Sequence, residues 1–404
     1  EVLDFIDGQR DLVIDLQTNL TKIKAINPEN GGDGEYQKFI FLKKYLSNWG
    51  FDAFNEILIQ DERVSDKVRP TLIATINGKS PKTLWLIAHT DVVPEGEINL
   101  WETDPFTATV IDDKIYGRGT EDNQQSLVSS LVAVKSLLVN KITPNYTVKL
   151  MFVSDEEVGS GYGIDWILQH RFDLFDKDDL VVTPDVGDPK GESIEIAEKS
   201  ILWITFKIKG KQSHGSRPDK GINAARASSY LCVALDEALH KRYSDKDLLF
   251  DIPYSTFEPT KRVGSVTNMN TIPGEEFLGF DCRILPKYDL GEVVSFIKSI
   301  VKDIEDRFGV TVEIETPQYL QAAPPTSKDA PVVKLLQKAI KEVHGRDTKL
   351  IGIGGGTVAA YFRMKKIPAA LWSTVDNTMH APNEYSSIKN TLSDAKVFVT
   401  MMLC

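Results

Sequence analysis

The chain has 404 residues, of which 42% are hydrophobic and 26% charged, and this composition excludes disordered, collagen-like and coiled-coil proteins. A chain of this length favours two domains over one. Its formal charge of -11 repels nucleic-acid phosphates and anionic lipids, so we expect neither nucleic acid nor a membrane as a partner. The three cysteines, Cys232, Cys282 and Cys404, are far apart and fit neither a disulfide framework nor a thiolate metal site. Residues 1–10 lack the pattern of a secretory signal, and we expect a cytoplasmic protein.

The first part of the chain alternates between the apolar patterns of helices and strands. Apolar residues recur at helical spacing over 12–23 and 36–49 and again over 127–138. Four short and almost wholly apolar runs are typical of strands in a parallel sheet that is covered on both faces: residues 84–88, 148–153, 180–182 and 369–372. This alternation predicts an α/β fold, a mostly parallel sheet with helices on both faces.

Residues 199–316 follow a different order. The pattern predicts a strand at 201–209 and a long helix at 222–241, followed by two strands around the Pro273-Gly274 turn. A second helix at 292–308 and a last strand at 310–315 complete the order. The order β-α-β-β-α-β is the ferredoxin-like arrangement and is complete in itself. We therefore expect an inserted lid or dimerisation domain at 199–316, between the two parts of a catalytic domain at 1–198 and 317–404.

Histidines and carboxylates follow each predicted strand of the parallel sheet. Reactive groups collect at the carboxyl ends of strands in such sheets, so these side chains should meet at one edge. Imidazole and carboxylate are ligands of zinc, and paired ions that share a carboxylate are a recurrent hydrolytic device. The candidates are His89 and Asp91, Glu156 and Glu157, Asp185, His380, and Asp122 just before the helix at 127–138.

A series of motifs in a fixed order extends this interpretation. They are HTDVVP at 89–94, GRGTED ending at Asp122, SDEEVGS at 154–160, QSHGSRP at 212–218 and GGGT at 354–357, followed by the late His380. Over nearly the whole chain the sequence resembles the di-zinc hydrolases that include succinyl-diaminopimelate desuccinylase, acetylornithine deacetylase, aminoacylase, carboxypeptidase G and the cytosolic dipeptidases. The resemblance implies a zinc-exopeptidase-like fold and a homodimer formed through the inserted domain.

The same resemblance implies two Zn²⁺ ions per subunit, with Mn²⁺ or Co²⁺ as substitutes. It assigns one ion to His89 and Asp185, the other to Glu157 and His380, and the bridging position to Asp122.

It also gives roles to residues beside the metals. Glu156 would be the general base, and Asp91 would hold the second nitrogen of His89. A cis peptide bond is expected at Asp122-Asn123. His214 would reach the active site of the partner subunit and stabilise the oxyanion. The implied substrate-binding residues are Asn270, Arg283, Gly355, Gly356 and Thr357.

The substrate stays open between two classes. The acidic ligand implied at position 185 is Asp, as in the dipeptidases, whereas desuccinylases generally have Glu there. In addition, Gln124 and Gln125 stand near the implied bridging residue, where many deacylases carry a lysine. These features favour a dipeptidase acting on a small, amino-acid-derived amide. The overall length and the residues of the motifs favour a desuccinylase-like or acetylornithine deacetylase-like enzyme instead. A binding protein without turnover is the remote alternative, and Glu156 and all five ligands argue against it because each is present.

Overall fold

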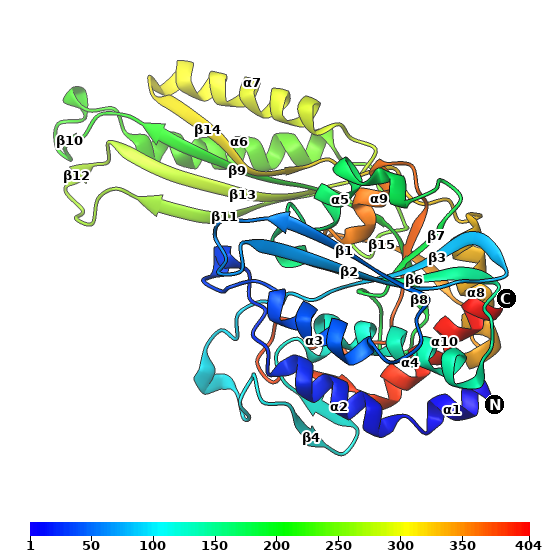
Figure 1. The fold of residues 1–404 in the computed structure, drawn as a ribbon. Coiled ribbons are helices and arrows are strands. Elements are labelled where there is room, and N and C mark those ends of the chain that lie inside the picture. Colours follow the sequence, from blue (N-terminus) through cyan, green and yellow to red (C-terminus); the bar gives the residue numbers. More distant parts are fainter. The chain divides into compact units, whose positions relative to one another are not determined.

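The computed structural model describes all of residues 1–404. The chain forms two compact units (Figure 1). The first contains residues 1–196, 326–350 and 357–404, and the second contains residues 197–325 and 351–356. None of the helices is long and apolar enough to cross a membrane.

An eight-stranded sheet forms the centre of the first unit, in the order β1-β2-β6-β3-β7-β16-β8-β15. Its middle strands run parallel: β6 (Tyr146–Val153), β3 (Ser80–His89), β7 (Leu180–Thr183) and β16 (Ala369–Leu371). The strands β1 (Ala53–Gln60) and β2 (Val68–Ile76) continue the sheet antiparallel on one side, and β8 (Ser193–Glu198) and β15 (Lys349–Ile353) lie on the other. The predicted α/β class with a mostly parallel sheet is confirmed.

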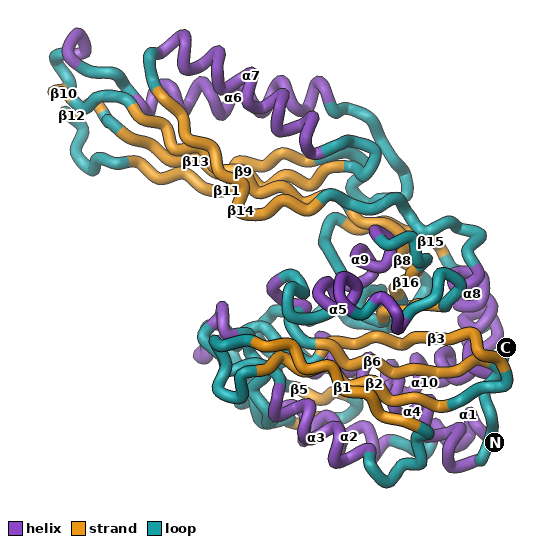
Figure 2. Tube along the Cα trace, turned by 45° about the horizontal axis from the view of Figure 1, so that its top comes forward, coloured by secondary structure: helices purple, strands orange, loops and turns teal.

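Helices cover both faces of this sheet (Figure 2). On one face, α4 (Ser126–Asn140) is buried along almost its whole length because α1 (Val2–Asp7), α2 (Arg10–Thr21) and α10 (Ile388–Leu403) pack over it. The helices α3 (Tyr36–Leu46) and α8 (Pro331–His344) contact β2 and β16. On the other face, α5 (Ile164–His170) and α9 (Val358–Met364) share one core with Trp85 and Ile87 of β3. Burial on both faces explains why β3 is a continuous apolar run.

A four-stranded antiparallel sheet and two helices form the second unit. The strand order is β11-β13-β9-β14, with β9 (Ser200–Lys209), β11 (Thr256–Gly264), β13 (Glu275–Ile284) and β14 (Thr311–Leu320). The helices α6 (Ala224–Arg242) and α7 (Leu290–Phe308) pack on one face of this sheet around a separate apolar core. This is the expected ferredoxin-like arrangement.

One local detail of that unit differs from the expectation. The strand before Pro273 is the two-residue β12 (Thr271–Ile272), which pairs with β10 (Ser213–His214) and not with β13. The strand β13 pairs antiparallel with β11, which ends at Gly264, and with β9. Proline has no N–H to donate to a ladder, so Pro273 ends the short ribbon instead of forming the turn of a hairpin.

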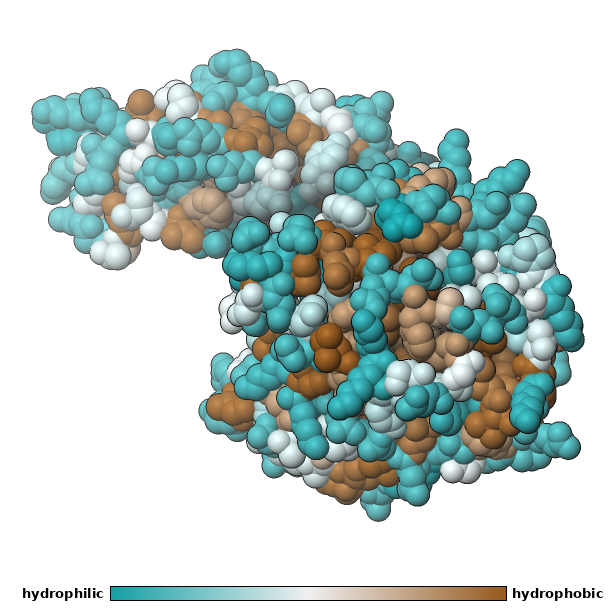
Figure 3. All heavy atoms as spheres, viewed as in Figure 1, coloured by the Kyte–Doolittle hydropathy of each residue, from teal (hydrophilic) through white to brown (hydrophobic).

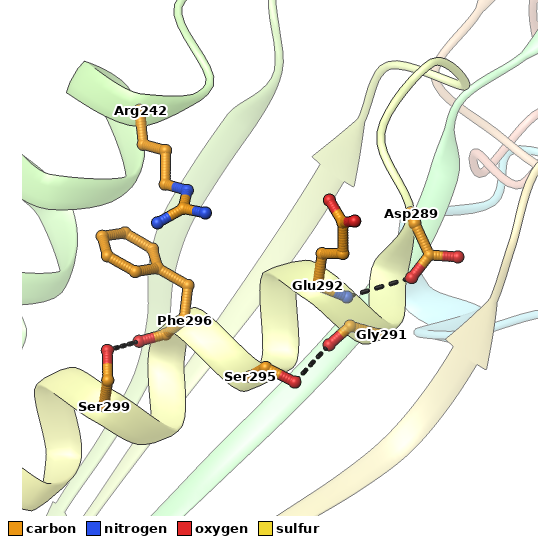
Figure 4. Close-up of a pocket in the computed structure, with 7 residues that line it drawn as sticks. All are labelled: Arg242, Asp289, Gly291, Glu292, Ser295, Phe296 and Ser299. Carbon is orange, nitrogen blue, oxygen red and sulfur yellow. Dashed lines mark hydrogen bonds between the residues drawn. The ribbon is translucent and has the colours of Figure 1, made fainter.

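The start of α7 shows how side chains set an element boundary. Asp289 accepts a hydrogen bond from the backbone N–H of Glu292 at 3.0 Å and so caps the helix (Figure 4). One turn later, the Arg242 guanidinium of α6 lies 4.3 Å from the centre of the Phe296 ring and joins the two helices. On the face seen in Figure 3, apolar residues are scattered among hydrophilic ones.

Candidate metal centre

The carboxyl ends of the parallel strands deliver the predicted side chains to one place. His89 is the last residue of β3, Glu156 and Glu157 follow β6 after a short turn, and Asp185 follows β7. The structure forms two groups in which all ligand atoms lie within 4.8 Å of one another: His89, Asp122 and Glu157, and His89, Glu156 and Asp185. These groups share His89, so they form one cluster.

Asp122 lies between two imidazoles. Its Oδ1 is 2.9 Å from Nε2 of His89, and its Oδ2 is 3.0 Å from Nε2 of His380. The two oxygens of one carboxylate thus face two different histidines. This is the arrangement that a carboxylate shared by two ions requires.

The remaining carboxylates surround this central residue. Glu157 places Oε2 3.1 Å from Nε2 of His380, while its buried Oε1 has no hydrogen-bond partner. Asp185 places Oδ1 3.7 Å from Nε2 of His89 and accepts a hydrogen bond from Asn123 at 2.6 Å. The peptide bond between Asp122 and Asn123 is cis, as predicted.

Negative charge exceeds positive charge in the cluster. The neighbouring carboxylates of Asp122 and Glu157 raise the pKa of His380 to about 10. Burial, followed by the charge of Asp122, raises the pKa of Glu157 to about 7. A divalent cation would relieve both the repulsion and the unpaired Oε1 of Glu157. The donor set of imidazole nitrogens and carboxylate oxygens is one that zinc takes, so the residues fit a metal ion.

Asp91 connects the histidine to the turn that carries the glutamates. Nδ1 of His89 lies 3.0 Å from the Asp91 backbone carbonyl oxygen and 3.4 Å from its carboxylate Oδ1. The Asp91 carboxylate also accepts hydrogen bonds from the backbone N–H groups of Glu156 at 3.1 Å and Glu157 at 3.0 Å. Asp91 therefore holds both the imidazole and the glutamate turn.

Glu156 lies beside the cluster with little exposure. Its Oε2 is 3.9 Å from Nε2 of His89, and 14% of its side chain is exposed. Burial, with the charges of Asp185, Glu157 and Asp122, raises the pKa of Glu156 well above its ordinary range. A carboxyl group with a raised pKa next to a cluster of candidate metal ligands suits a residue that takes up and returns a proton.

Comparison with known proteins identifies the family. The profile of "Peptidase family M20/M25/M40" matches residues 85–403. The chain belongs to this family. The resemblance drawn from the motifs is thereby confirmed, and the chain is a metal-dependent peptidase or amidohydrolase.

Its relatives in the family and in fold include both hydrolase classes. The chain is 42% identical to an uncharacterized metallohydrolase of Methanocaldococcus jannaschii, over 96% of this chain and 98% of the relative. It is 30% identical to succinyl-diaminopimelate desuccinylase of Nautilia profundicola, over 96% of this chain and 97% of the relative. Human carnosine dipeptidase 1 has a similar fold, with a TM-score of 0.75, 16% identity and coverage of 100% and 97%.

A buried lysine that contacts Gln124, two residues after Asp122, was not predicted from the sequence. The Nζ atom of Lys38 donates to Oε1 of Gln124 at 2.9 Å and to the carbonyl oxygen of Thr90 at 3.0 Å. Burial lowers the pKa of Lys38 to about 8. A cation thus lies beside the position where the sequence lacks one. Nothing in the sequence marks Lys38, because it precedes Gln124 by 86 residues.

Most of the other predicted site residues of this M20 chain lie in two groups in the second unit. His214 of β10 is exposed, contacts Ser216 Oγ at 2.8 Å and pairs with Thr271, next to Asn270. Arg283 near the end of β13 donates to the carbonyl oxygen of Gly354 at 2.8 Å, in the glycine loop that contains Gly355 and Gly356.

A cavity of about 300 Å³ lies beside Arg283, with Lys199 and Phe250 among its lining residues. Thr357 belongs to the first unit, where its Oγ1 caps α9 by accepting from the N–H of Ala359 at 3.2 Å. The structure therefore groups Arg283 with the glycine loop, and Thr357 directly follows that loop at the start of α9.

Proposed function

We propose that this chain is a di-zinc hydrolase that cleaves the amide bond of a small, amino-acid-derived substrate. The position of Asp122, with one oxygen toward His89 and the other toward His380, is the observation that carries the proposal. One ion would be held by His89 and Asp185, the other by Glu157 and His380, and both by Asp122. Mn²⁺ or Co²⁺ would substitute for Zn²⁺.

Glu156 would act as the general base. When bound, the ions would lower the pKa of a water molecule to about 7 and polarise the substrate carbonyl. The Glu156 carboxylate would accept the proton of that water as it attacks and then deliver the proton to the leaving amine. Asp91 would hold the turn of Glu156 in place through the two backbone N–H bonds described above.

A dipeptide is the substrate class that we favour. Aspartate at position 185 is the feature behind this choice, and the fold shared with human carnosine dipeptidase 1 is compatible with it. An N-acyl or N-succinyl amino acid is the second candidate, favoured by the 30% identity with a desuccinylase. Both classes carry a carboxylate, which the guanidinium of Arg283 would bind.

A substrate screen with metal analysis tests the proposal. Protein loaded with Zn²⁺ or Mn²⁺ would be assayed on free-amine dipeptides and on their N-acyl and N-succinyl counterparts, beside a Glu156→Gln variant. We expect hydrolysis of dipeptides, a loss of turnover of ~10²–10⁴-fold in the variant, and an unchanged content of two ions. Cleavage of blocked substrates alone would replace the dipeptidase assignment with the deacylase one. A variant that lost an ion would make Glu156 a ligand.

We also propose a homodimer in which His214 serves the partner subunit's site. His214 and Arg283 lie at opposite ends of the ten-residue strand β13 and its adjoining ribbon, roughly 30 Å apart at 3.3 Å per residue. The two side chains of one chain are therefore too far apart to contact one small substrate together. A second copy of the chain could supply His214 to a site where Arg283 binds the substrate. The cytoplasmic location stays a prediction.

A further inference from the structure

Two buried glutamates next to the metal cluster have no part in the function proposed above. Glu121 precedes the bridging Asp122, and Glu384 lies in the segment that follows His380. Their exposed fractions are 3% and 0%. A buried carboxylate is costly unless its oxygens are fully hydrogen-bonded, so the partners of these two residues indicate what they do.

Glu384 binds the main chain that leads to Asp122. Its Oε1 accepts from the N–H groups of Glu121 at 3.1 Å and Asp122 at 2.9 Å. Its Oε2 accepts from the N–H of Gly119 at 2.8 Å and from the Arg118 guanidinium at 2.7 Å. Four donors on one short segment therefore fix the backbone of the bridging residue.

Glu121 binds the main chain that leads to His380. Its Oε1 accepts from the N–H groups of Asp376 at 2.6 Å and Asn377 at 3.1 Å. Its Oε2 accepts from the N–H of Thr378 and from the Thr378 hydroxyl, the latter at 2.7 Å. This loop has no regular secondary structure between β16 and β17 (Tyr385–Ser387), so these bonds supply the order that a helix or strand would otherwise give.

The segment before Asp122 and the loop around His380 are thus held together by reciprocal hydrogen bonds. Each contributes a glutamate that the backbone of the other surrounds, and a strand pairing between Tyr116 and Tyr385 joins them at one end. Hydrogen bonds to an ionised carboxylate are about twice as strong as neutral ones. The His380 side chain is 53% exposed, and the backbone of His380 is left-handed with φ of +61°. Packing alone therefore does not set the direction of this side chain.

We propose that Glu121 and Glu384 are positioning residues that hold Asp122 and His380 at the separation required by the two ions. Glu384 fixes the bridging carboxylate, and Glu121 fixes the loop of the histidine that faces it. The inference rests on the proposed di-metal function.

Metal binding by glutamine variants of the holoenzyme tests this inference. Glutamine keeps the size of glutamate but turns an NH₂ group toward N–H donors. We expect Glu121→Gln to lower the affinity for one Zn²⁺ ion by ~10–100-fold, because only the loop that carries His380 loses its hydrogen bonds. Glu384→Gln is expected to lower the affinity for both ions, because the backbone of Asp122 itself loses its hydrogen bond. Competition titration with a chelator gives the affinities, and the visible absorption of the Co²⁺ form gives the geometry of each position.

Asp179→Asn is the matched control. Asp179 is also buried and accepts from Trp85 Nε1 at 2.8 Å and from the N–H of Asp176 at 2.9 Å, but it precedes β7, at the end away from Asp185. We expect this control to lower stability and leave both ions bound. Thr378→Val removes the hydroxyl's bond to Glu121 and its two bonds with the Tyr385 backbone, and it leaves the three backbone N–H bonds to Glu121 in place. It should lower the affinity for one ion several-fold even if the glutamine variants do not fold.

Unchanged affinity for both ions in the Glu121, Glu384 and Thr378 variants would overturn the inference, as would equal weakening in the Asp179 control. Fewer than two ions in the wild-type protein would instead overturn the di-zinc function itself.

Discussion

Buried carboxylates in this molecule differ in how fully they are compensated. Glu384 has four donors, yet burial still raises its pKa to about 7. Asp394 on α10 has an Oδ2 that accepts from the N–H of Thr374 at 2.9 Å and an Oδ1 with no hydrogen-bond partner. Burial raises the pKa of Asp394 from 3.8 to about 7. Between these values the folded chain holds a proton that the unfolded chain has released, so stability falls as pH rises from about 4 to about 7.

Asp394→Asn should therefore stabilise the protein at pH 8. Asparagine keeps an oxygen for Thr374 and carries no charge. The pKa change from 3.8 to about 7 corresponds to at most ~4 kcal/mol of unfolding free energy. We expect the variant's advantage in urea unfolding to be largest at pH 8 and to shrink toward pH 5. Parallel stability curves for the two proteins across this range would contradict the assignment.

At the scale of elements, a buried arginine ties three of them together. Arg69 of β2 is fully buried and donates to Glu35, the residue directly before α3, through Nε at 2.7 Å. Its other nitrogens lie 3.3 Å from Asp61 and 3.0 Å from Asp155, the residue before Glu156. The strand, the helix and the turn that carries the glutamates thus share one cation.

Arg69→Met should cost ~3–5 kcal/mol of unfolding free energy, because Glu35 and Asp155 lose their counter-charge in the interior, while Asp61 keeps its ion pair with Arg63. Adding Glu35→Gln to that variant removes one of the uncompensated charges and should recover part of the loss. Urea unfolding of the two single variants and the double variant measures the coupling. Additive effects would mean that the arginine and glutamate do not stabilise each other.

Whether an element was predictable depended on its burial. β3, β6 and β7 are covered on both faces, so each is a short apolar run that the sequence displays. The edge strand β1 alternates between buried Ile57 and Ile59 and the exposed Glu56, Leu58 and Gln60, and β2 carries the buried Arg69. Neither has the uninterrupted apolar pattern of the central strands, and neither was predicted.

At the scale of the whole molecule, the expected dimer makes a prediction about mixed subunits. His214→Ala should lower turnover by ~10²–10³-fold. A purified heterodimer of a His214→Ala chain and a Glu156→Gln chain would contain one site with an intact base and an intact partner histidine. Its activity should recover to about half that of the wild-type dimer. A heterodimer as inactive as its parents would show that His214 acts within its own chain.

By itself, the sequence determined the α/β class and the ferredoxin-like order, because strand burial and element order leave a local pattern along the chain. Its motifs also predicted the histidines and carboxylates that the fold brings together, and their role as metal ligands stays a proposal. Only the tertiary structure decided how those residues are held. Lys38 reaches Gln124 across 86 residues, and Glu384 reaches Asp122 across 262. Such pairs leave no periodic signal, because their partners are backbone groups and single side chains that meet only after the sheet and its loops have folded.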